Sequence, residues 1–172
     1  EQVTEIYVAT FNRAPDSAGL DYWENSSLTI LEIAESFFDQ KETQDLYPVT
    51  LDNEEFVDTI YDNLFNRDAE KAGSDYWVAE LEAGTITRAQ MIMAVVNGAQ
   101  GTDDDILANK TEVGLYFADN GETLNYAQSV IVMQDVDETE GSVEAAKDQV
   151  DEWNGEDMPA PIIDTIATDD MV

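Results

Sequence analysis

The side chains of this chain that can do chemistry are mostly carboxylates and amides, gathered in short polar segments. Three such segments are Asp103-Asp104-Asp105, Asp119-Asn120-Gly121-Glu122 and Asp135-Val136-Asp137. Hard cations such as Ca²⁺ bind several oxygen ligands, drawn from carboxylates, amides and carbonyls. The segments therefore predict calcium binding, and a solvated acidic surface is the alternative. The candidate ligands are Asp103, Asp104, Asp105 and Asp119.

A second candidate cation site occurs twice, in polar turns that follow the tripeptide Phe-Asn-Arg. The first turn offers oxygens from Asn12 and Asp16, and the second offers oxygens from Asn66 and Glu70. Either turn has the oxygen-rich character that calcium prefers. We therefore expect that the same kind of ion site can form twice.

The composition limits catalytic chemistry. The chain has no cysteine and no histidine, which excludes disulfides, thiol nucleophiles and thiolate or imidazole metal sites. Acid and base catalysis would require a pair of carboxylates, as in glycoside hydrolysis. No arrangement of residues in the sequence singles out such a pair, so we predict that the chain is not an enzyme.

The net charge restricts the partners. There are 39 Asp and Glu against 7 Lys and Arg, which gives −32 at pH 7. Such a chain repels nucleic acid, whose affinity for proteins comes largely from cations on phosphates. It also repels itself, so full stability should require salt or bound cations. No apolar run approaches the length of a transmembrane helix, so membrane insertion is not expected.

Two stretches of the chain, Ile6 to Trp23 and Ile60 to Trp77, are copies of one another. At an offset of 54 residues, 10 of the 18 aligned positions are identical. Two of the three arginines, Arg13 and Arg67, fall at the same place in the two copies. A guanidinium fork holds carboxylates or carbonyls at fixed angles. We predict that Arg13 pins its turn through Asp16 or Asp21, and that Arg67 does so through Glu70 or Asp75.

Each copy continues with a glycine and a Tyr-Trp pair. A glycine inside a helix costs about 1 kcal/mol relative to alanine, so Gly19 and Gly73 are expected to mark the close approach of another helix. The tryptophans have two interpretations, core packing and stacking against sugar rings. The candidates for glycan stacking are Trp23, Trp77 and Trp153.

The hydrophobic periodicity is helical almost throughout and predicts an all-α fold. We expect two pseudo-repeats of about three helices each, followed by a C-terminal helical extension and an extended tail. Capping boxes at Thr87 and loosely at Asp52 support helix starts there, and Asp68 and Thr102 are further expected N-caps. The expected units are a first repeat over residues 1–50, a second over 51–120, C-terminal helices over 121–153, and a tail or linker over 154–172.

The repeated pattern resembles a known bacterial domain family of unknown function. The first copy reads Y-x3-F-N-R-x-P-D-x2-G-L-x-Y-W, and the segments GTITRAQMI and DDDILANKTEVGLYFAD also fit the family. The family occurs in surface-layer proteins, adhesins and repeats-in-toxin proteins, and is distantly similar to phycobilisome linker domains. Asn12 and Asn66 stand where the family usually has glycine, and Ala69-Glu70 replaces its Pro-Asp.

The resemblance implies a secreted, mostly helical module of a larger, calcium-dependent surface protein, and the chain is expected to be a fragment or processed product. We therefore expect an extracellular or cell-surface location. The expected function is attachment to cell-envelope polysaccharide or self-association, assisted by calcium. Two alternatives remain. One is an accessory domain of a secreted enzyme that acts on polysaccharide, and the other is a halophile protein with a salt-adapted acidic surface.

Overall fold

A computed structural model describes residues 1–155 of the 172, and within them all regular structure is helical, which confirms the predicted all-α class. The helices are α1 (Gln2–Phe11), α2 (Ser17–Glu24), α3 (Ile30–Phe37), α4 (Lys41–Leu46), α5 (Asn53–Phe65), α6 (Lys71–Ala83), α7 (Arg88–Gly98), α8 (Thr102–Asn120), α9 (Tyr126–Ile131) and α10 (Glu140–Gly155). The predicted tail of residues 154–172 is corrected at its start, because α10 extends through Gly155. Its other residues lie outside the described part.

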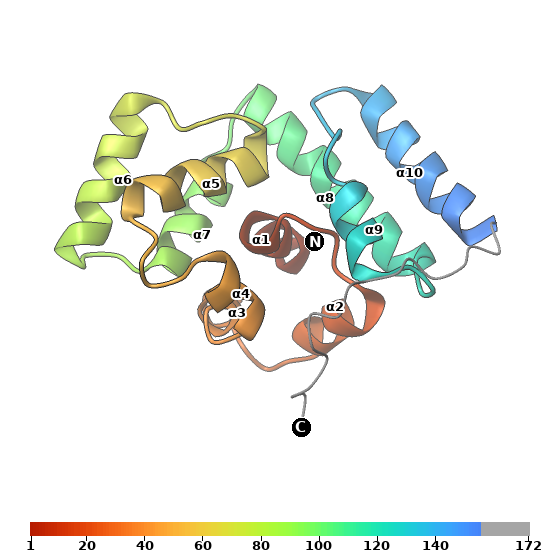
Figure 1. Ribbon diagram of the computed structural model, residues 1–172, viewed down its shortest axis with the longest axis horizontal. Helices are drawn as coiled ribbons and strands as arrows, with labels where there is room; N and C mark the ends of the chain where they lie inside the picture. Colours follow the sequence, from red (N-terminus) through yellow and green to blue (C-terminus); the bar gives the residue numbers. More distant parts are fainter. Residues whose placement is uncertain (156–172) are drawn as a thin grey trace.

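Helix α1 is the centre of the molecule. In Figure 1 it is seen nearly end-on, with the other helices arranged around it. It contacts α2, α3, α4, α5, α7 and α8. Eight of its ten residues are buried, so α1 has no solvent-facing stripe of the kind that a surface helix shows.

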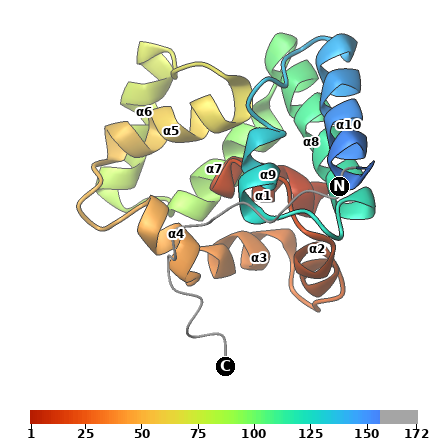
Figure 2. The ribbon, with the colours of Figure 1, turned by 45° about the vertical axis from the view of Figure 1, so that its right-hand side comes forward.

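Three apolar clusters form the core, and α1 contributes to each of them. Ala9 belongs to the cluster of α5 and α7, Phe11 to the cluster of α2 and α3, and Val8 to the cluster of α8, α10 and the segment that follows α9. Helix α10 lies along α8 in both views (Figures 1 and 2). The fold is therefore held together through α1, with no single large core.

Local sequence signals set several helix starts as predicted. Thr87 forms a complete capping box with Gln90 at the start of α7, and Asp52 accepts a hydrogen bond from the Glu55 amide at the start of α5. These features depend on residues within one turn of each other, which is why the sequence reveals them.

Three local predictions are wrong. Asp68 is not the N-cap of α6, because the helix starts at Lys71 and its N-cap is Glu70. The Asp68 carbonyl instead accepts a hydrogen bond from the Arg67 side chain. Thr102 is the first residue of α8, and the N-cap is Gly101, whose φ of 58° suits glycine. The first repeat, expected to hold about three helices over residues 1–50, contains a fourth, α4.

The glycines of the repeated motif do not mark a close helix approach, contrary to the prediction. A Cβ on Gly73 would lie 3.7 Å from the Tyr61 hydroxyl, which is an ordinary contact. A Cβ on Gly19 would lie 3.2 Å from the carboxylate of Asp16, the N-cap of its own helix. The close approach occurs at Gly114 instead, where a Cβ would lie 2.8 Å from Thr4 Cγ2 on α1.

Gly114→Ala is therefore expected to destabilise the protein by about 1–3 kcal/mol, because the added methyl group must displace buried Thr4 at the contact between α1 and α8. Gly73→Ala, in the first turn of α6, should instead stabilise by up to about 1 kcal/mol through helix propensity. Urea unfolding of both variants tests this difference. A stabilising Gly114→Ala would show that the two helices are not in tight contact there.

Within residues 1–155, each helix is either too short or too polar to cross a lipid bilayer.

Candidate functional site

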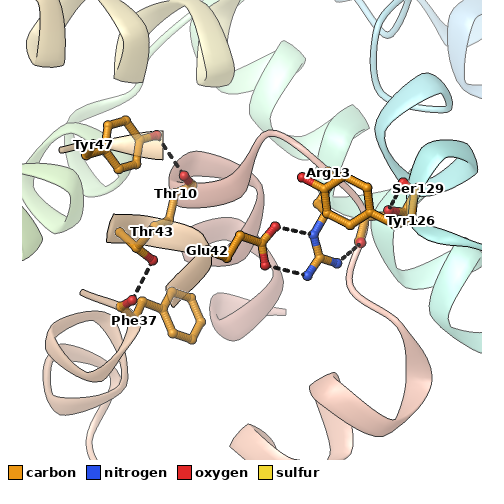
Figure 3. A network of polar contacts seen from close by, with 9 residues as sticks. Thr10, Arg13, Phe37, Glu42, Thr43, Tyr47, Tyr126 and Ser129 are labelled. Carbon is orange, nitrogen blue, oxygen red and sulfur yellow. Dashed lines mark hydrogen bonds and ion pairs between the residues drawn. The ribbon is translucent and has the colours of Figure 1, made fainter. Parts of the chain in front are cut away.

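Arg13 is buried and binds both carboxylate oxygens of Glu42 in α4 through one edge of its guanidinium. Its Nε lies 2.8 Å from Glu42 Oε1, and its Nη2 lies 2.9 Å from Oε2. Its Nη1 donates to the Ala14 carbonyl at 3.1 Å (Figure 3). The predicted partners Asp16 and Asp21 are therefore wrong. The Asp16 carboxylate accepts from the Gly19 amide instead, as the N-cap of α2.

Aromatic rings surround the Arg13 guanidinium. The Arg13 Cζ atom lies 4.8 Å from the centre of the Tyr7 ring and 5.2 Å from that of Tyr126. Burial opposes the charge of Arg13 most strongly, but the hydrogen bond to Glu42 and the charge interactions with Tyr7, Glu42 and Tyr126 together outweigh burial and raise the pKa of the guanidinium. Burial also raises the pKa of Tyr7 to about 12. Arg13 and Glu42 therefore form a fixed ion pair. Next to it, the Ala14 amide donates a hydrogen bond to the carbonyl of Ser129 in α9.

Arg67 makes the equivalent interaction with Asp103, not with Glu70 or Asp75. Its Nε lies 3.0 Å from Asp103 Oδ1 and its Nη2 lies 2.7 Å from Oδ2. Asp75 is instead in an ion pair with Lys71, one turn earlier on α6. The two arginine partners are 29 and 36 residues away in the sequence. No local pattern could have identified them, since only the fold brings α4 and α8 to these turns.

Lys110 is a buried cation in this region that the sequence did not single out as a candidate. It is only 1% exposed, and its Nζ donates at 2.6 Å to the Asn63 carbonyl and at 2.6 Å to Asn66 Oδ1. Burial lowers its pKa to about 8. The sequence does contain a signal for its burial, because Lys110 lies at helical spacing from Ile106, Leu107 and Val113, which are all buried in α8.

All seven cationic side chains are bonded within the fold. Besides Arg13, Arg67, Lys71 and Lys110, Arg88 donates to the Leu51 carbonyl, Lys41 pairs with Asp45, and Lys147 pairs with Glu112. No Lys or Arg lies outside residues 13–147, so this covers the cations of the whole chain. The cations therefore serve internal contacts, and the carboxylates dominate the surface.

The two asparagines of the repeated turns meet at one cavity. Both Asn12 and Asn66 are left-handed C-caps, with φ of 48° and 55°. They line a cavity of about 430 Å³ together with Asp62, Lys110, Asp135 and Asp137. Asn66 is fully engaged there, because its Nδ2 donates to the Val136 carbonyl and its Oδ1 accepts from Lys110.

The other candidate metal ligands lie elsewhere. Asp16 and Glu70 are N-caps of α2 and α6, Asp103 is paired with Arg67, and Asp104, Asp105 and Asp119 are exposed on α8. Across residues 1–155, no three Asp, Glu, His or Cys side chains are grouped so that they could hold a metal ion. The structure therefore brings together Asn12 and Asn66 but separates them from the remaining candidates.

The three tryptophans are each half-buried against a different core cluster. Trp23 lies against the cluster of α2 and α3, Trp77 against that of α5 and α7, and Trp153 against that of α8 and α10. Next to two of them, the tyrosines are exposed, 68% for Tyr22 and 56% for Tyr76. Each tyrosine ring meets its tryptophan edge-on, with ring centres 4.8 Å apart.

One family model matches a segment in the middle of the chain, residues 34–100. No curated protein and no solved structure matches this chain. The matched segment runs from α3 through α7 and includes Arg67 and the second Tyr-Trp pair. Residues 34–100 match the family model "Domain of unknown function (DUF4214)", and the predicted resemblance to a family of unknown function is thereby confirmed.

Proposed function

We propose that this chain is a non-catalytic module of an extracellular or cell-surface protein, and that its function is attachment or self-assembly assisted by calcium. The observation that carries the proposal is the use of the cations. All seven Lys and Arg side chains have a hydrogen-bond or ion-pair partner within the chain, with Lys41 and Lys71 paired at the exposed surface, while the net charge is −32. A partner must therefore be uncharged or cationic, or the contact must be bridged by bound cations.

Calcium suits this role because its preferred ligands are the carboxylate oxygens that cover the surface. A divalent ion held between carboxylates of two copies offsets the repulsion that each copy would otherwise feel. Exposed apolar side chains supply contact area for such an interface. Tyr22, Leu28 and Leu31 are 68%, 41% and 36% exposed on or beside α2 and α3.

The alternative with a specific observation in its favour is salt adaptation. The same charge of −32 would be expected of a protein that works at high salt, where monovalent ions screen the repulsion. The two accounts differ in ion specificity. Salt adaptation requires ionic strength alone, whereas calcium-assisted assembly requires a divalent cation at low concentration.

Sedimentation velocity at fixed ionic strength tests the assembly proposal. We expect the chain to sediment as a monomer in EDTA and as larger species in millimolar calcium, with magnesium much less effective. Tyr22→Asp and Leu31→Asp should weaken the association, because each adds a negative charge to the exposed face of α2 and α3. A monomer in calcium, or equal association in sodium chloride, would reject calcium-assisted assembly.

A further inference from the structure

Helix α10 and the residues at the end of α9 border a groove of about 440 Å³. Its apolar surface comes from Ile131 and Val132 on one side and from Ala145 and Ala146 on the other. Ile131 is 43% exposed and Ala145 is also exposed, so this apolar surface is open to solvent. Because two alanines in succession are short, they leave room on α10 for an apolar side chain from a partner.

Three carboxylates line the same groove, those of Asp135, Asp148 and Glu152, and all three residues are exposed. Within residues 1–155, none of these carboxylates forms an ion pair. The one cation of α10, Lys147, pairs with Glu112 of α8 instead. The groove therefore combines apolar surface with negative charge that the described part of the chain does not neutralise.

We propose that this groove binds a basic segment of a partner protein, which places an apolar side chain between Ile131 and Ala145 and its Lys or Arg side chains beside the carboxylates. An apolar anchor in a pocket supplies most of the affinity of such a contact. The cations supply orientation and a faster encounter, since exposed ion pairs add little affinity by themselves. Charge complementarity thus selects a basic partner for this surface.

The charges of the chain disfavour the other occupants. A second copy cannot supply the cations, because all seven of its Lys and Arg side chains are already engaged within the chain. Residues 156–172 contain five Asp and Glu and no Lys or Arg, so the groove repels them. A single metal ion is disfavoured because no three acidic side chains of residues 1–155 are grouped to hold one.

Backbone amide resonances in ¹⁵N spectra of the full chain provide the test, in EDTA and at physiological ionic strength. The probe is a short synthetic peptide in which lysines flank two central leucines. One comparison peptide has serines in place of the leucines, and the other has glutamates in place of the lysines. We expect the first peptide to shift the resonances of Ile131, Ala145 and Gln149 saturably, with a dissociation constant on the order of 100 μM. The serine peptide should bind at least about tenfold more weakly, and the glutamate peptide should leave the spectrum unchanged.

Variants of the apolar surface separate the groove from other exposed apolar residues. Ile131→Ser removes one wall, and Ala145→Arg fills the space beside it with a bulky cation. Each should weaken binding of the leucine peptide by at least about tenfold. Val49→Ser, at a fully exposed residue outside the groove, should leave the affinity unchanged.

Variants of the carboxylates separate the groove from the general acidity of the surface. Asp148→Asn combined with Glu152→Gln should weaken binding clearly. Glu54→Gln combined with Glu82→Gln removes the same charge from exposed positions of α5 and α6, and should have little effect. Equal losses in the two double variants would overturn the inference, because the peptide would then respond only to the net charge.

Four further results would also overturn it. One is that no resonance of the groove shifts, and another is that the serine peptide binds as tightly as the leucine peptide. The third is that millimolar calcium shifts the groove resonances without peptide, because a metal ion would then be the ligand. The fourth is that these resonances move with protein concentration or on removal of residues 156–172, because the chain itself would then fill the groove. The groove lies on other elements than the exposed face of α2 and α3, so Ile131→Ser should retain calcium-dependent sedimentation whether or not it loses the peptide.

Discussion

Between pH 8 and pH 10, the free energy of unfolding of this chain is expected to rise by about 2 kcal/mol, owing to Lys110. Burial lowers the pKa of this lysine from 10.5 to about 8. Below pH 8 both the folded and the unfolded chain hold the proton, and the buried charge destabilises the folded state. As pH rises from 8 toward 10.5, the folded chain releases the proton first, and this penalty disappears.

The rise should end above pH 10. Burial raises the pKa of Tyr7 to about 12, so the unfolded chain ionises this phenol before the folded chain does. Stability from Tyr7 is present below pH 10 and is lost as pH approaches 12. The two groups together predict a maximum of stability near pH 10, which is unusual for a protein with so many carboxylates.

Lys110→Met removes the titrating group and should abolish the rise between pH 8 and pH 10. Lys147→Met is the matched control, because its pKa is raised by its hydrogen bond to Glu112, so its removal should leave the rise intact. Urea unfolding at three pH values and constant ionic strength measures the free energy of unfolding of the wild type, Lys110→Met and Lys147→Met. Equal slopes for the wild type and Lys110→Met would show that Lys110 is not buried as a charged group.

Arg13→Lys is expected to lower the free energy of unfolding by about 2 kcal/mol, although the charge is retained. An ammonium group cannot reach both oxygens of Glu42 and the Ala14 carbonyl in the geometry of the guanidinium fork. The Arg13 side chain is only 10% exposed, so water cannot replace the lost donors easily. Chemical unfolding of the variant measures the loss.

Arg67→Lys is the matched comparison for this prediction. Arg67 makes the same two-pronged contact with Asp103, but its side chain is 38% exposed. The change should therefore cost less than about 1 kcal/mol. Combining Arg13→Lys with Glu42→Gln should cost less than the sum of the single changes, because both remove the same interaction. Equal effects at the two arginines would contradict the burial argument.

The helices were largely predictable because their signals are local. Thr87 and Asp52 cap helices through residues three positions later, and the repeated pattern makes the first two helices of each copy visible. The partners of the arginines could not be predicted, since Glu42 and Asp103 reach their turns only through the packing of α4 and α8. With 39 acidic residues in the chain, a nearby carboxylate was the natural but wrong choice.

The candidate site was only partly predictable for a related reason. Asn12 and Asn66 were identified as equivalent, but that they share one cavity depends on how α1 and α5 end relative to α8.

Thermal unfolding in EDTA and in millimolar calcium, at matched ionic strength, tests whether calcium binds the folded chain. We predict a calcium-specific rise in Tm that clearly exceeds the rise in magnesium, as expected when calcium held between carboxylates of two copies stabilises the folded, associated chain. At a hundredfold excess of calcium over its dissociation constant, one site stabilises by about 2.7 kcal/mol. Identical melting in EDTA, magnesium and calcium, together with a rise in sodium chloride, would contradict the account and leave salt adaptation as the explanation of the charge.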